Sequence, residues 1–105
     1  MIDVNDEGFD REVLQAAGPV LVDFTLDGCA PCRAIAPAID ELAAKYNGKL
    51  KIVKVDVASS PQAVARFRVL GAPTLVILKA GREVMRTVGA LPKAVLAAQV
   101  GQALA

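Results

Sequence analysis

The stretch Gly28-Cys29-Ala30-Pro31-Cys32-Arg33 contains both cysteines of the chain and separates a strand-like run of residues from a helix-like run. At such a junction the first cysteine lies where unpaired backbone N–H groups and the helix dipole favour a thiolate. A C-x-x-C pair in this setting is typical of a redox dithiol. The main alternative is metal ligation, but zinc takes four Cys or His ligands, and this chain has no histidine and two cysteines. We therefore expect no metal, except at a site shared between chains.

Length and composition predict one domain over residues 1–105. A chain of this length buries most of its apolar surface without staples, and 54% hydrophobic and 22% charged residues are ordinary for a globular protein. The formal net charge of +1 gives no global electrostatic reason to expect nucleic acid or an anionic membrane as a partner.

The chain shows no targeting signal that we can identify. It starts with the acidic segment Met1-Ile-Asp-Val-Asn-Asp-Glu where a secretory signal is basic, and no apolar run approaches the roughly 18 residues that span a bilayer. We therefore expect a cytoplasmic protein. Two cysteines three positions apart also argue against a structural disulfide, because closing so short a loop removes little entropy from the unfolded chain.

Hydrophobic patterning predicts strands and helices in alternation. Apolar runs predict a short strand at 2–4, buried strands at 20–24, 50–57 and 74–78, and a mixed strand at 83–88. Helical spacing or start signals predict helices at 9–17, from near 29 to 46, at 61–68 and from 92 to 104. Pro37 is expected to kink the second helix or to interrupt one of its backbone hydrogen bonds, and Ser60 with Pro61 is expected to open the third. This order predicts an α/β fold with one mixed sheet, whose last two strands are antiparallel neighbours.

With its elements in this order, the chain resembles the thioredoxins along its whole length. The resemblance is carried, in register, by Val22-Asp23-Phe24, Cys29-Ala30-Pro31-Cys32, Ile35-Ala36-Pro37, Gly71-Ala72-Pro73-Thr74, Gly81 and Val88-Gly89-Ala90-Leu91. It implies the thioredoxin fold, with about five strands in a central mixed sheet and about four flanking helices. It also implies reversible thiol–disulfide exchange on protein substrates, no cofactor, and a thioredoxin reductase, usually a flavoprotein, that restores the dithiol.

The positions of individual residues, together with this resemblance, predict their roles. Cys29, at the helix start, is expected to be the nucleophile, and the more shielded Cys32 the resolving thiol. The resemblance implies that Asp23 accepts the proton of Cys32, although a solvated edge-strand carboxylate is the alternative reading. Lys54 is either a partner of Asp23 or a plain surface lysine. Substrate contacts are expected from Gly28, Ala30, Pro31, Ala72, Pro73, Gly89 and Ala90.

Pro73 has two readings. Local sequence favours a proline placed just before a strand, whereas the resemblance implies a cis proline packed against the dithiol. In the second reading the Ala72 backbone turns outward and pairs with an extended substrate segment.

The chain departs from the thioredoxin pattern beside the first cysteine. Gly28 and Ala30 stand where the family usually has tryptophan and glycine, and Thr25 stands where an aromatic residue is common. The loss of this cover is expected to loosen the surface beside Cys29. The predicted function is a general, monomeric protein-disulfide reductase. The alternatives are a partner-specific or more oxidising thioredoxin-like protein, and a binding module that works without redox turnover.

Overall fold

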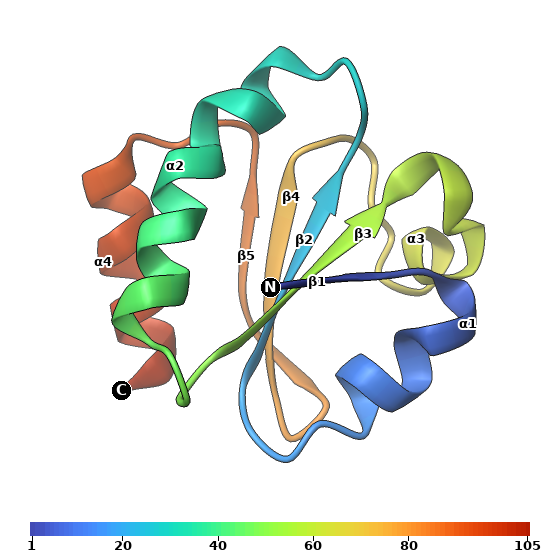
Figure 1. The fold of residues 1–105 in the computed structure, drawn as a ribbon, viewed down its shortest axis with the longest axis horizontal. Coiled ribbons are helices and arrows are strands. Elements are labelled where there is room, and N and C mark those ends of the chain that lie inside the picture. Colours follow the sequence, from blue (N-terminus) through green and yellow to red (C-terminus); the bar gives the residue numbers. More distant parts are fainter.

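A computed structural model describes residues 1–105 and contains one five-stranded mixed sheet (Figure 1). Across the sheet the strands are β1 (Ile2–Val4), β3 (Lys51–Asp56), β2 (Val20–Thr25), β4 (Thr74–Lys79) and β5 (Arg82–Val88). The first three are parallel, and β4 is antiparallel to both of its neighbours. The helices are α1 (Asp6–Phe9), α2 (Ala30–Lys45), α3 (Pro61–Arg66) and α4 (Lys93–Leu104). This is the predicted thioredoxin fold.

Helices cover both faces of the sheet and create two cores. In Figure 1, α2 and α4 lie on one side of the sheet and α1 and α3 on the other. Because successive strand residues point to opposite faces, Val22 and Phe24 of β2 enter the core beneath α1 and α3, whereas Leu21 enters the core beneath α2 and α4. Every residue from Val20 to Phe24 is buried, as its continuous apolar run predicted. Asp23 shares the face of Leu21 and so points toward α2.

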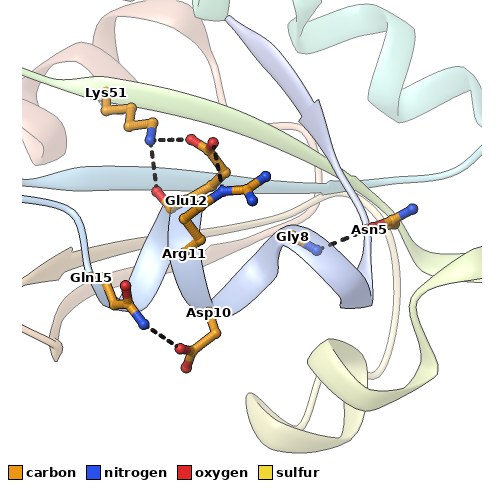
Figure 2. Close-up of polar contacts among 7 residues, drawn as sticks. All are labelled: Asn5, Gly8, Asp10, Arg11, Glu12, Gln15 and Lys51. Carbon is orange, nitrogen blue, oxygen red and sulfur yellow. Dashed lines mark hydrogen bonds and ion pairs between the residues drawn. The ribbon is translucent and has the colours of Figure 1, made fainter.

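The first helix starts earlier and ends earlier than its apolar spacing predicted. Asn5 caps α1 by accepting the N–H of Gly8 at 3.3 Å, and the chain then widens into a π-helical turn, Asp10–Leu14. Figure 2 shows two contacts that hold this turn: the Gln15 side chain bonds Asp10, and Lys51 of β3 bonds both the carboxylate and the backbone carbonyl of Glu12. The α-helical and π-helical turns together end at Leu14, three residues before the predicted end at 17.

The predicted serine cap of α3 is wrong. Ser60 occupies the N-cap position and Pro61 opens the helix, but the Ser60 hydroxyl is buried and makes no hydrogen bond. Instead the carboxylate of Asp6 accepts the N–H groups of Gln62 and Ala63, both at 2.9 Å. The cap is therefore supplied by a helix more than fifty residues away in the sequence.

The C-terminal end of α3 lies two residues before its predicted end. Arg68 adopts a left-handed conformation, with φ at 51°, and its N–H donates to Ala65 while that of Val69 donates to Val64. This pair of bonds is a Schellman motif, which stops the helix and turns the chain toward β4. The second helix, by contrast, starts where predicted, and Pro37 lies in its interior.

Candidate redox-active site

The two cysteines lie at the amino end of α2, where they form a disulfide. Cys29 is the N-cap residue, and its Sγ accepts the backbone N–H of Cys32 at 3.2 Å. A helix N-terminus stabilises negative charge, so in the reduced protein this position favours the thiolate of Cys29. Cys29 is half-buried, whereas Cys32 is only 8% exposed.

The residue before the pair determines how the chain reaches it. Gly28 has a φ of 72°, a left-handed conformation that other residues adopt only with strain. A Cβ added at this position would meet nothing within 4 Å. Gly28 therefore leaves the surface beside Cys29 open, and its backbone conformation disfavours any larger residue.

Asp23 is buried on the central strand of the sheet, at 5% exposure, so the reading as a solvated edge-strand carboxylate is wrong. Burial raises the pKa of its carboxyl to about 6, and the positive charge of Lys54 opposes that rise. Lys54 lies directly opposite Asp23 in the parallel register of β2 and β3. No ion pair closer than 4 Å joins the two side chains, so Lys54 acts on Asp23 through space.

A pocket of about 260 Å³ connects these groups. Asp23, Lys54 and Cys32 all line it, together with Gly28. Because a water molecule takes about 30 Å³ in the liquid, the pocket has room for several waters. The buried cysteine and the buried carboxyl therefore open onto one common space.

The segment before β4 reaches the dithiol from the other side. The Ala72–Pro73 peptide bond is cis, as the resemblance implied, and Pro73 is buried. The carbonyl oxygen of Ala72 lies 3.7 Å from the Sγ of Cys29, an atom that can donate to it once the disulfide is reduced. Gly89 donates its N–H to the Pro73 carbonyl at 2.9 Å, which places Gly89 and Ala90 beside this segment.

Comparisons with known proteins agree with this geometry. A family model described as Thioredoxin matches residues 1–102. The chain is 45% identical over 102 residues to Thioredoxin C-2 of Corynebacterium nephridii, which covers 97% of this chain and 94% of that protein. It is 46% identical over 93 residues to Thioredoxin 1 of Nostoc sp., covering 89% and 87% of the two chains. It is 43% identical over 98 residues to Thioredoxin of Pseudomonas aeruginosa, covering 93% and 91%.

The chain belongs to the thioredoxin family. Its function is thiol–disulfide exchange, and its activity is that of a protein-disulfide reductase. Membership of the thioredoxin family implies disulfide-bearing protein substrates and a reductase that restores the dithiol. Among its helices, none combines the length and apolar character needed to cross a membrane.

Sequence reasoning missed several residues that surround the thioredoxin dithiol. Asp27, Arg33 and Asp40 also line the pocket that holds Asp23. Thr25, Asp27 and Lys54 are shared with a larger polar pocket of about 760 Å³ on the side of β1 and α1. The position of Asp27, two residues before Cys29, is a local signal that could have identified it. No local signal points to Asp40, which is one of two acids on α2 and lines the pocket only because of how that helix packs.

Proposed function

We propose that Cys29 is the nucleophile of this reductase and Cys32 the resolving thiol, acting within one domain of residues 1–105. The Cys29 thiolate attacks one sulfur of a substrate disulfide, forms a mixed disulfide, and releases the other substrate sulfur as a thiolate that takes up a proton. Cys32 then loses its proton and attacks the Sγ of Cys29. This step forms the Cys29–Cys32 disulfide and releases the second substrate thiol, so two electrons pass to the substrate. The N-cap position and greater exposure of Cys29 support this assignment.

Asp23 is proposed to accept the proton that Cys32 loses. Its support is the shared pocket and a carboxyl pKa of about 6, which lets the group exchange a proton near neutral pH. Lys54 keeps the ionised form of Asp23 accessible by opposing the effect of burial. Its proposed role is thus to keep the pKa of Asp23 below the value that burial alone would give.

The substrate is proposed to bind as an extended segment along Ala72 and Pro73. The backbone N–H groups of Leu70, Gly71 and Ala72 have no hydrogen-bond partner in the protein. Unpaired backbone groups beside a reactive sulfur suit recognition by strand addition. The remaining proposed contacts lie around this segment, at Gly28, Ala30, Pro31, Gly89 and Ala90.

The recycling partner is proposed to be a flavoprotein reductase, and the protein is proposed to work as a cytoplasmic monomer. A reducing compartment suits this activity, because a dithiol whose reductase is present stays available for the next substrate.

Trapping of mixed disulfides tests the assignment of the two thiols. Cys32→Ser removes the resolving thiol, so reduced Cys32→Ser incubated with a disulfide-bonded protein such as insulin should accumulate a covalent complex through Cys29. The matched variant Cys29→Ser should accumulate far less, because its remaining thiol is buried. In the protein that keeps both cysteines, Asp23→Asn should slow the resolution of the mixed disulfide by Cys32 more than it slows its formation. Equal or greater trapping by Cys29→Ser would reverse the roles. Binding of the substrate unchanged in a variant with both cysteines replaced by serine would favour a redox-independent binding module.

A further inference from the structure

The two most exposed large apolar side chains of the molecule lie on either side of Ala72 and Pro73. Leu70 is 101% exposed and Val88 is 65% exposed, whereas the other exposed large apolar residues lie between 40% and 53%. Leu70 precedes Ala72 by two residues, and Val88 pairs with Thr74 in the ladder between β4 and β5. A single exposed leucine is ordinary on a protein surface. Two such residues flanking the segment that touches the reactive sulfur indicate a binding surface.

The exposure of Leu70 is imposed by the local structure. The Schellman motif at the end of α3 buries Val69 at 7% exposure, so the next side chain is turned outward. Arg86 of β5 holds the same turn by donating to the carbonyl of Phe67 at 2.7 Å. These hydrogen bonds fix the turn that follows α3 and thereby hold Leu70 at the surface. The turn requires Arg68 to adopt a left-handed conformation.

We propose that Leu70, with Val88 on the other side of Ala72 and Pro73, determines substrate specificity by selecting disulfides that have an aliphatic or aromatic residue within two positions of the attacked cysteine. This inference rests on the proposed binding of an extended segment along Ala72. Alternate side chains of an extended segment point to the same side, about 7 Å apart, and Leu70 lies two residues before Ala72. When the substrate sulfur faces Cys29, a neighbouring substrate side chain is thus placed over Leu70. An apolar side chain there removes both surfaces from water.

Two arginines near the end of α3 differ in whether their side chains are free to bind a substrate. Arg86 is already paired with Glu83 at 2.8 Å and with the Phe67 carbonyl. Arg68 is exposed and makes no side-chain bond, so an acidic substrate residue is the competing choice at this position. The experiment distinguishes the apolar from the acidic preference.

The test uses symmetric disulfide dimers of short peptides in which the residues next to cysteine are Leu, Ser, Lys or Glu. Single-turnover reduction by the dithiol form is followed by acid quenching and chromatography. The wild-type protein should reduce the Leu peptide about five to ten times faster than the Ser peptide, as expected for covering an aliphatic side chain of this size. Leu70→Ser should bring that ratio close to one, and Leu70→Lys should shift the preference toward the Glu peptide. The control Val84→Ser removes an exposed apolar residue near the other end of β5 and should keep the wild-type ratio.

Three results would overturn the inference. The first is a Leu-to-Ser ratio that survives in Leu70→Ser, and the second is an equal loss of the ratio in Val84→Ser. The third is a wild-type preference for the Glu peptide, which would assign the surface to Arg68. Failure of the proposed function is distinguishable from all three, because it appears in the trapping experiment as equal or greater capture by Cys29→Ser, whatever the peptide ratios.

Discussion

Asp23 is the residue whose environment differs most from its ordinary one. It lies on the central strand, flanked in the sheet by Lys54 on β3 and Leu75 on β4, and it accepts no hydrogen bond from another side chain. An ionised carboxylate in such surroundings costs free energy, because burial removes the water that would solvate it. The pocket toward Cys32 and the positive charge of Lys54 offset part of that cost.

The first prediction follows from the sign of this shift. The pKa of Asp23 is about 6 in the folded protein and 3.8 in the reference state, so between these values the folded protein binds more protons than the unfolded chain. The free energy of unfolding therefore falls as pH rises from about 4 to 6, by up to about 3 kcal/mol from this one group. Asp23→Asn should be more stable than the wild-type protein at pH 8 by up to that amount, and about equally stable at pH 3.5.

Urea unfolding at both pH values measures this difference. The exposed Asp3→Asn on the edge strand β1 serves as the control and should show no comparable pH dependence. A stability difference for Asp23→Asn that is the same at pH 3.5 and pH 8 would contradict a buried, ionised Asp23.

Among the secondary-structure elements, α3 depends most on a distant residue. It has only six residues, too few to be stable alone, and its own N-cap side chain makes no hydrogen bond. Asp6 of α1 satisfies two of its free N–H groups and places a negative charge at its positive end. These two hydrogen bonds join α1 to α3, and both helices lie on the same side of the sheet (Figure 1).

The second prediction compares the two candidate caps. Asp6→Ala should lower the free energy of unfolding by about 1–2 kcal/mol, because it leaves the N–H groups of Gln62 and Ala63 without their acceptor. Ser60→Ala should change it by less than about 0.5 kcal/mol, because the Ser60 hydroxyl has no bond to lose. Urea unfolding of both variants measures the contrast. A larger loss in Ser60→Ala than in Asp6→Ala would restore the serine as the cap.

On the scale of the whole molecule, two hydrophobic cores share one sheet. Leu78 belongs to the core beneath α1 and α3, and Leu75, three residues earlier on the same strand, belongs to the core beneath α2 and α4. Tyr46 packs against the second core, whereas Phe9 and Phe24 lie in the first. Because the strands belong to both cores, neither core can be lost without exposing the other.

The third prediction is that both cores unfold together, as one domain over residues 1–105. Tyr46 fluorescence, which reports the core beneath α2 and α4, should follow the same urea transition as far-UV circular dichroism. Leu78→Ala, in the opposite core, should shift both midpoints equally and cost about 2–5 kcal/mol, as should its matched variant Leu75→Ala. Separate midpoints for the two signals, or a Leu78→Ala effect absent from Tyr46 fluorescence, would divide the chain into independent units.

Features that depend on a few neighbouring residues could be read from the sequence. The apolar run from Val20 to Phe24 identified a strand buried on both faces, and the position of Cys29 between a strand and an apolar helical stripe placed the helix start within one residue. The short turn at Ala80 and Gly81 was enough to pair β4 with β5. These signals are local because the hydrogen bonds and side-chain spacing that produce them span only a few positions.

The contacts that build the site have no such local signal. The Ala72 carbonyl reaches Cys29 from 43 positions away, and Asp6 caps a helix 56 positions further on. Lys54 faces Asp23 because the parallel register pairs those two residues, whereas a register shifted by one would have sent the lysine to the other face. Strand register and helix packing are set by the burial of many side chains at once. The pattern of apolar residues therefore determines the elements, and only the folded sheet determines which polar groups meet around the dithiol.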